Sequence, residues 1–185
     1  GAFLAGSYSD DNYVSFGDYG LLDGDRSYPS GDRGYDMITA RWPVRSSGEI
    51  RTIIDKIRTY ESSPDFGPWR TEVTLVADDE FGAFNSESFH VTQTEELEKS
   101  HLPRVFNRNK IYLWDFPFVN DVKPAVNEAI LGAMNSGTLL INYVGHGNPD
   151  VWAHERVFTR TGDLPNLRDN GRLPLVYAVS CAIGY

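Results

Sequence analysis

The chain has 185 residues, of which 41% are hydrophobic and 23% charged, and its formal net charge is -9. This composition predicts one soluble globular domain and argues against nucleic-acid or anionic-membrane partners, because no basic surface is available for them. No apolar run approaches the roughly 20 residues that span a bilayer, so we expect no membrane insertion, and no signal peptide is recognisable at the start. A single cysteine excludes an internal disulfide.

Residues 1–34 are rich in Gly, Asp, Ser and Tyr and show no lasting periodicity. We expect a loop-rich opening segment here, with one short strand at Tyr13–Phe16. Its acidic run Asp23-Gly24-Asp25 lacks the ligand spacing of an EF-hand loop, so a solvated loop is favoured over a calcium site.

The clearest helix of the first half follows a strand at residues 37–44 that a proline stops. Ser46 or Ser47 offers an N-cap, and the helix is predicted to end before Pro64. Its apolar residues recur at the spacing of one helix face: Ile50, Ile53, Ile54, Ile57 and Tyr60.

Strand and helix patterns alternate through the rest of the chain. We expect strands at 73–77, 110–114, 139–144 and 175–179, long helices at 93–102 and 122–134, and a short helix near 163–167. This order predicts an α/β fold with a doubly wound, mostly parallel sheet flanked by helices in three layers. No repeat or linker divides the chain, so residues 1–185 are expected to form a single domain.

Two residues able to do covalent chemistry follow the last two strands. His146 lies between two glycines just past Val144, and Cys181 comes two residues after Val179. Functional groups gather at the carboxyl ends of parallel strands, so the imidazole and the thiol meet if these strands are neighbours. A thiol needs such a base to become a thiolate near neutral pH. Taken alone, each residue is as well explained by packing or by a sharp turn.

The imidazole also needs a partner that fixes its tautomer. The acids Asp78, Asp79 and Glu80 after the 73–77 strand, and Glu87 beyond them, are the candidates, and the residues alone do not choose among them. The amides of Gly147 and Cys181 lie where an oxyanion needs donors, provided that the strands are adjacent. Trp152 is a candidate wall of a substrate pocket and equally a core residue.

Other chemistries fit less well. His146, His154 and Glu155 do not match the HExxH spacing of a zinc site, and one cysteine cannot build a usual structural zinc centre. The GxSxG elbow of serine hydrolases is absent from the sequence.

The chain resembles the gingipain family of caspase-like cysteine peptidases. The resemblance rests on Asn142-Tyr143-Val144-Gly145-His146-Gly147, on Trp152-Ala153-His154-Glu155, and on Leu173-Pro174-Leu175 with Ser180-Cys181. Upstream it extends through Arg41-Trp42-Pro43-Val44, Trp69-Arg70 and Val76-Ala77-Asp78-Asp79-Glu80. The Trp-Ala-His-Glu-Arg run is most similar to the branch that includes the sortase of the type IX secretion system.

The resemblance implies a caspase-like fold and a cysteine endopeptidase or sortase-type transpeptidase that acts on protein or peptide substrates. It implies that Cys181 is the nucleophile, His146 the general base and acid, and Glu80 the acid that orients the histidine. It further implies an oxyanion hole at Gly147 and Cys181 and a substrate-facing acid at Glu87.

The resemblance also implies a bacterial secreted or envelope protein whose chemistry needs no cofactor. It allows calcium as a structural ion at positions that the sequence does not give, so the metal ligands are unknown. The family's catalytic domain has further portions at both ends, so the chain is expected to be a truncated piece. The alternative function is a non-catalytic module that binds calcium or a protein on the same scaffold; a small-molecule hydrolase that uses the same pair is a third reading.

Overall fold

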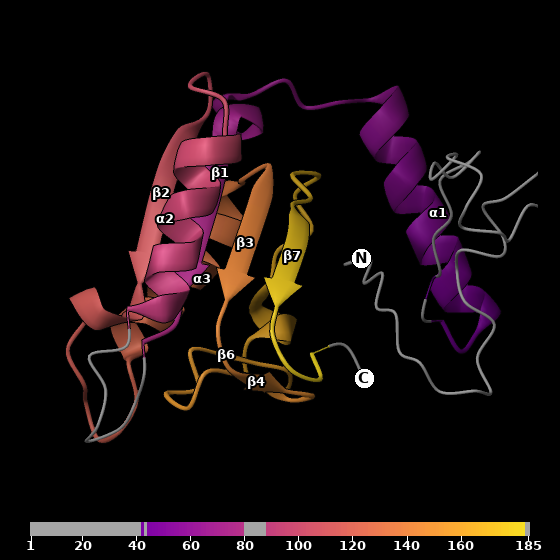
Figure 1. Ribbon diagram of the computed structural model, residues 1–185. Coiled ribbons are helices and arrows are strands. Elements are labelled where there is room, and N and C mark those ends of the chain that lie inside the picture. Colours follow the sequence, from indigo (N-terminus) through magenta and orange to yellow (C-terminus); the bar gives the residue numbers. More distant parts are fainter. Residues whose placement is uncertain (1–41, 43, 80–87, 184–185) are drawn as a thin grey trace, which may run out of the picture. The chain divides into compact units, whose positions relative to one another are not determined.

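The computed structural model describes residue 42, residues 44–79 and residues 88–183 (Figure 1). The predicted opening segment 1–34 with its short strand, nearly all of the 37–44 strand, Glu80 and Glu87 lie outside these residues. The chain falls into two compact units that divide within the first helix, and everything described below for the sheet and the site belongs to the unit that begins at Ile54. The single-domain prediction for 1–185 therefore stays a prediction.

Helix α1 spans Ser47–Ser62, as its apolar spacing predicted. The Ser46 hydroxyl accepts a hydrogen bond from the Glu49 amide at 3.2 Å, and the Glu49 carboxylate accepts one from the Arg45 amide at 2.6 Å. These side chains satisfy backbone donors that a helix start leaves free, so Ser46 acts as the N-cap.

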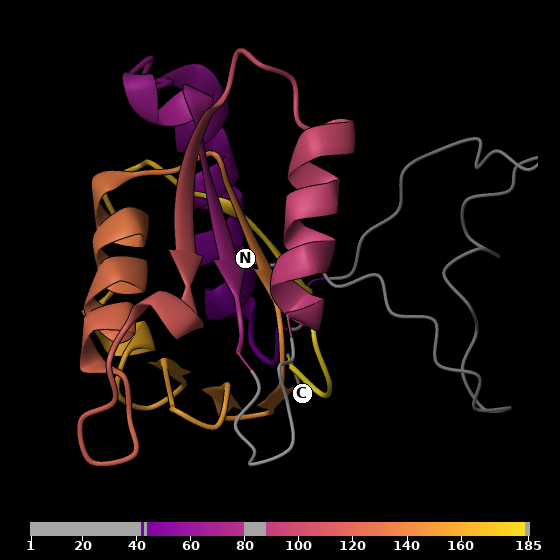
Figure 2. The same ribbon diagram turned by 60° about the vertical axis from the view of Figure 1, so that its left-hand side comes forward.

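The main sheet has four parallel strands in the order β2-β1-β3-β7. Their bounds are β1 (Glu72–Ala77), β2 (Asn107–Tyr112), β3 (Leu140–Val144) and β7 (Leu175–Val179). Helix α2 (Phe89–His101) joins β1 to β2, and helix α3 (Pro124–Ser136) joins β2 to β3. Figures 1 and 2 show α2 and α3 on opposite faces of the sheet. The predicted α/β fold, a parallel sheet flanked by helices in three layers, is confirmed.

The alternation of side chains along β1 divides the core between the two faces. Val73, Leu75 and Ala77 pack with Val91 of α2, whereas Val76 packs with Val126 and Ile130 of α3. Because both faces are covered, five of the six residues of β1 are buried, which is why its sequence after Glu72 is apolar except at Thr74.

Several boundaries differ from the sequence prediction. Helix α2 begins at Phe89, before the predicted residue 93, because Val91 and Thr94 are buried against the sheet. Strand β2 begins at Asn107 rather than at residue 110, since the polar residues there pair through their backbones with β1. The chain leaves β2 after Tyr112 in a 3-10 turn, Leu113–Asp115. Tertiary pairing outweighs local propensity in each case.

The segment between β3 and β7 forms a second, antiparallel sheet that the sequence did not predict. Its strands are β4 (Gly147–Asn148), β5 (Val151–Trp152) and β6 (Phe158–Thr159), followed by a 3-10 turn, Leu164–Asn166, near the predicted short helix. Strands of two residues are too short to show the alternation of apolar and polar residues by which a strand is predicted. None of the helices in the described part is long and apolar enough to cross a membrane.

Candidate active site

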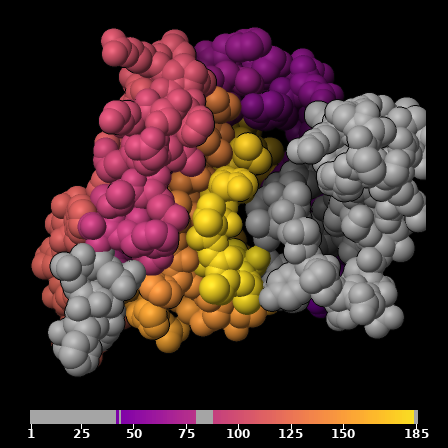
Figure 3. Space-filling model, viewed as in Figure 1, coloured from indigo at the N-terminus to yellow at the C-terminus, as the bar shows by residue number. Residues whose placement is uncertain are grey.

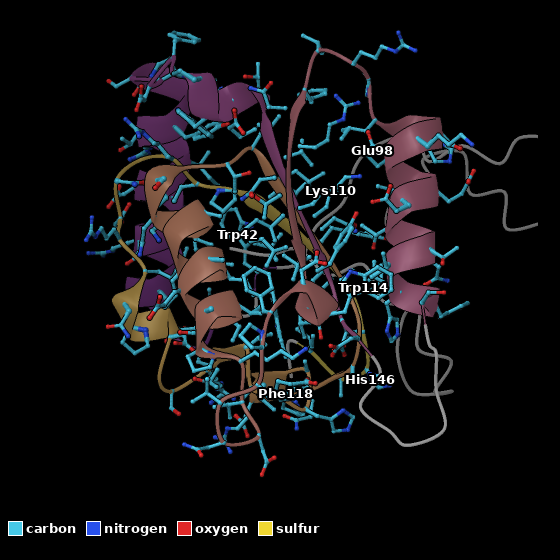
Figure 4. All side chains as sticks on the ribbon, turned by 90° about the vertical axis from the view of Figure 1, so that its left-hand side faces the viewer. Trp42, Glu98, Lys110, Trp114, Phe118 and His146 are labelled. Carbon is cyan, nitrogen blue, oxygen red and sulfur yellow. The ribbon has the colours of Figure 1, made fainter. Side chains whose placement is uncertain are left out.

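The candidate site lies at the carboxyl edge of the main sheet. From β1 the chain first builds β2 on one side and then returns to build β3 on the other, so the direction of winding changes between β1 and β3. Such a switch point leaves a crevice at the carboxyl ends of the two strands. Asp78 follows β1 and His146 follows β3, and Figure 4 shows His146 beyond this edge of the sheet.

Asp78 holds His146 through two contacts to one carboxylate oxygen. Its Oδ2 accepts a hydrogen bond from the His146 backbone amide at 2.8 Å and lies 2.9 Å from Nδ1 of the imidazole. A carboxylate offers no proton, so Nδ1 carries the hydrogen and Nε2 is left as an acceptor. The Asp78 side chain is completely buried, whereas that of His146 is 45% exposed. Asp78 therefore holds Nδ1 of a partly exposed ring in place and leaves Nε2 free to accept a proton.

Burial raises the pKa of Asp78, and the hydrogen bonds from His146 oppose that rise. Each effect acts on the charged form of the carboxyl: desolvation disfavours it and the two N–H donors favour it. The ionised state of Asp78 therefore depends on His146 as much as the orientation of His146 depends on Asp78.

Two glycines allow the close approach that this arrangement requires. A Cβ atom on Gly145 would lie 2.3 Å from the Cβ of Asp78, and one on Gly147 would lie 2.5 Å from the Ser180 hydroxyl and 2.7 Å from Ile183. No side chain fits at either position without displacing its neighbour. Gly145 thus lets β3 lie against Asp78, and Gly147 lets the chain after β3 lie against the turn after β7.

Cys181 lies in that turn, between Ser180 and Ile183 in sequence. Strands β3 and β7 are paired with Val144 opposite Val179, and the Gly145 amide donates to the Val179 carbonyl at 3.2 Å. His146 and Cys181 each come two residues beyond this register pair, so the condition of adjacent strands is met. The thiol is exposed, and the next residue, Ala182, has a left-handed φ of 51°.

A group of largely buried charged residues lies next to Asp78. Asp79 receives a short hydrogen bond from the Lys123 ammonium, which also donates to the Leu113 carbonyl at 2.6 Å. Glu155 is 1% exposed, and neither of its carboxylate oxygens has a hydrogen-bond partner. Burial, with the nearby carboxylates of Asp78 and Asp79, raises the pKa of Glu155 to about 7. The Lys123 ammonium therefore pairs with one of these three acids, Asp79.

Oxygen donors of this group fit a hard cation. One carboxylate oxygen from each of Asp78, Asp79 and Glu155 lies within 4.8 Å of the others. One oxygen of each aspartate and both of Glu155 lack partners, and calcium takes such oxygen ligands. Sequence patterns indicated no position for a calcium ion, and among the described residues this is the set with the matching donors.

The predicted substrate wall, Trp152, is a core residue. It is 7% exposed and stacks on the Tyr143 ring at 4.5 Å with an interplanar angle of 13°. This placement favours the packing role that the sequence left open, and substrate contact stays a prediction. The roles of Glu80 and Glu87 also stay predictions, since both lie outside the described residues.

Sequence reasoning gave no role in the site to four residues near the pair. His90 and His154 place their rings 5.0 Å and 5.1 Å from that of His146, and Lys123 and Glu155 form the buried charge group. The charged residues carried no signal because a lysine or glutamate in a loop is usually solvated. A histidine on another element becomes a neighbour only through the sheet topology.

The sequence as a whole matches a known protein family. A model described as Peptidase family C25 matches residues 5–185. The chain belongs to this family. It is 24% identical to gingipain R2 and to gingipain R1 of Porphyromonas gingivalis over 155 residues. These matches cover 83% of the chain but 20% and 15% of the two relatives, respectively.

Two solved structures share the fold of this family C25 chain. The crystal structure of the Arg-specific cysteine proteinase gingipain R aligns with a TM-score of 0.58 at 22% identity, covering 76% of this chain and 31% of that one. The complex of the P. gingivalis RgpB pro- and mature domains aligns with a TM-score of 0.52 at 24% identity, covering 75% and 31%. The fold is therefore caspase-like, and the chain spans less than a third of each of these proteins.

Replacing Gly145 by Ala in this family C25 chain should destabilise it. The added methyl must displace Asp78 or the Tyr143 hydroxyl, which is 2.6 Å from its position, and such overpacking costs about 1–3 kcal/mol. Gly132 in α3 is the matched control because a Cβ there meets nothing within 4 Å. Gly132→Ala should stabilise by roughly 0.5–1 kcal/mol. Urea denaturation measures the free energy of unfolding of both variants. A Gly145→Ala variant as stable as the wild type would contradict the close approach of Gly145 to Asp78.

Replacing Lys123 by Met should destabilise the chain by about 3–5 kcal/mol, because it leaves buried carboxylates without their cation. Lys110→Met is the control: Lys110 pairs with Glu95 and Glu98 at the surface between β2 and α2 (Figure 4), and its side chain is 35% exposed. That loss should stay below about 1 kcal/mol. Equal losses in denaturation at pH 7 would show that Lys123 does not compensate the acids.

Proposed function

We propose that this chain carries the reacting groups of a cysteine endopeptidase, with Cys181 as nucleophile and His146 as general base and acid. The observation that carries the proposal is the parallel pairing of β3 with β7, which brings His146 and Cys181 to one edge while Asp78 fixes the histidine tautomer. Membership in a peptidase family supports the same reading.

The reaction follows from the protonation states of these groups. Nε2 of His146 takes the proton of the Cys181 thiol, and the thiolate attacks the carbonyl carbon of a peptide bond. The tetrahedral intermediate collapses to a thioester as the imidazolium returns its proton to the departing amine. Water, or the amine of a second peptide, then attacks the thioester and restores the thiol. Hydrolysis and transpeptidation thus share the first half of the mechanism.

The amides of Gly147 and Cys181 are proposed to stabilise the oxyanion of the intermediate. Gly147 immediately follows the base, and its backbone lies against Ser180 and Ile183, which bracket Cys181 in the turn after β7. Amides on two segments that pack this closely would be held in place before the reaction begins, which would make them effective donors.

Asp78 is proposed as the residue that orients His146, in the role that the gingipain resemblance gave to Glu80. Its carboxylate already contacts both the ring and the backbone of the histidine. Glu80 follows Asp78 by two residues in the sequence, so variants of both acids are compared.

The proposed substrates are proteins or peptides, with a secreted or envelope location in a bacterium and a sortase-type branch of the family as the finer assignment. These rest on the family relationship and on the Trp152–Arg156 run. Calcium at the carboxylates of Asp78, Asp79 and Glu155 is proposed as a structural ion. It would offset their charge and take no part in the bond cleavage.

Covalent labelling tests the nucleophile. A peptide inhibitor with a thiol-directed electrophile should modify the chain once, because Cys181 is its single cysteine. Cys181→Ala should abolish the mass shift while preserving the circular dichroism spectrum. His146→Ala should slow labelling at pH 7 by about 10²-fold or more, because the thiolate loses its base. Labelling of wild type no faster than that of the urea-unfolded chain would contradict the assignment.

Turnover of a peptide substrate tests the orienting acid. Asp78→Asn should lower kcat by about 10²–10⁴-fold because the amide no longer enforces the Nδ1–H tautomer, while slow covalent labelling persists. Glu80→Gln is the matched variant and should leave kcat within a few-fold. The opposite ranking would assign the orienting role to Glu80, and equal large losses would mean that the two acids act together.

A further inference from the structure

His90 extends the Asp78–His146 pair into a group with metal-ligand chemistry. Because helix α2 runs back along the sheet, its start lies at the carboxyl edge, and His90 is its second residue. The His90 ring meets the His146 ring edge-on, with 5.0 Å between centroids and an interplanar angle of 87°. Nδ1 of His90 is buried and has no hydrogen-bond partner. A buried imidazole nitrogen without a partner is unusual enough to call for a ligand.

The donor atoms of this group are already close together. One ligand atom from each of Asp78, His90 and His146 lies within 4.8 Å of the other two. Asp78 adds a second unsatisfied atom, since its Oδ1 is buried without a partner and its side chain is completely enclosed. Two elements, α2 and the end of β1, thus each carry an unpartnered buried polar atom on a residue of this group.

We propose that Asp78, His90 and His146 form a site for a first-row transition-metal ion such as Zn²⁺, whose occupancy prevents His146 from acting as a base. Two imidazoles and one carboxylate are donors that zinc accepts, and three protein ligands leave one position open for water. Calcium prefers oxygen donors alone, so it suits the overlapping set in which Asp79 and Glu155, in place of the two histidines, accompany Asp78.

Metal binding and the proposed peptidase reaction compete for the same groups. Nδ1 of His146 carries a hydrogen toward Asp78, and Nε2 is the nitrogen that accepts the thiol proton. Coordination of the metal at Nδ1 moves that hydrogen to Nε2, and coordination at Nε2 occupies its electron pair, so neither mode leaves a nitrogen that can take the thiol proton. The inhibitory part of the proposal therefore rests on the proposed function, because it needs His146 to be the base. The binding part does not, since it depends on the ligand geometry alone.

His154 provides an internal control. Its ring lies 5.1 Å from that of His146, almost the same distance as His90, but it is exposed and does not belong to the group of converging donors. If proximity to His146 were sufficient for metal capture, both histidines would contribute. If the converging geometry decides, His90 contributes and His154 does not.

Zinc binding is measured by competition with a chromophoric chelator in the Cys181→Ala background, where the thiol cannot act as a ligand. We expect one Zn²⁺ per chain, an affinity lowered at least roughly tenfold by His90→Asn, and no change with His154→Asn. Circular dichroism and thermal melts show whether each variant is folded. Undiminished zinc affinity in folded His90→Asn, or an equal loss in both variants, would overturn the site.

X-ray absorption of the zinc-loaded Cys181→Ala chain gives a readout that does not depend on a His90 variant. Scattering from two imidazoles is expected, whereas a shell of oxygen donors alone would place the ion on the acidic group and contradict the proposal. Glu155→Gln complements this test, because it should weaken an ion on the acidic group but leave an ion at His90 in place.

Inhibition is then measured with the thiol present, as the zinc concentration that halves the rate of each variant relative to its own metal-free rate. Wild type and His154→Asn should be inhibited at the same zinc concentration. For His90→Asn this concentration should be at least about tenfold higher, in proportion to its weaker zinc affinity. Zinc binding by a chain that lacks peptidase activity would leave the metal site standing and remove the proposed function. If zinc inhibits His90→Asn as strongly as wild type, the proposed function stands and the metal site at His90 is contradicted.

Discussion

The buried carboxylate of Asp78 is the constraint on which the site depends. It comes one residue after the most enclosed strand of the sheet, and it accepts hydrogen bonds from both the backbone and the ring of His146. A charged group without solvent must find such donors or lose its charge. The geometry of His146 is therefore set by the electrostatic needs of Asp78, and Gly145 provides the room for the two to meet.

The charged residues around Asp78 are also largely buried and also depend on one another. Lys123 is enclosed with its ammonium on Asp79, and Glu155 lies beside both aspartates with no hydrogen-bond donor of its own. Burial, together with the two neighbouring aspartates, raises the pKa of Glu155 to about 7. An edge that concentrates acids and histidines can support the base of a peptidase and can also attract a cation. The placement of His90 favours a metal that accepts nitrogen, and the placement of Glu155 favours one that accepts oxygen alone.

The relation to gingipains agrees with this arrangement at the level of the fold. At 22–24% identity and with less than a third of each solved chain covered, the likeness establishes the parallel sheet and its helices. The chemistry is argued from this chain's own atoms: a paired register between β3 and β7, an oriented imidazole and an exposed thiol. Strand β7 is the last strand in the order of the main sheet, and Figure 3 shows it at the surface. The side chains of Leu175, Tyr177 and Val179 are exposed there.

The long helices and the strands of the main sheet, and the fold class they form, could be predicted from patterns within short segments of the sequence. The apolar runs that became β1, β3 and β7, the N-cap at Ser46 and the helix spacing after it are local signals, because each depends on residues near one another in the chain. The glycines that flank His146, and the cysteine after the last strand, were local signals too. Because functional groups gather at the carboxyl ends of parallel strands, these signals also led to the hypothesis that His146 and Cys181 lie close together.

The acid that contacts the histidine could be identified only in three dimensions, because no pattern in the sequence distinguishes Asp78, Asp79 and Glu80. The contact of Asp78 with His146 depends on the pairing of β1 with β3. Strand order and packing also place Trp152 in the core, create β4, β5 and β6, and bring His90 and His154 beside His146. Lys123 and Glu155 are buried although their residue types are usually solvated. These facts depend on contacts between distant segments, and no periodicity within one segment records them.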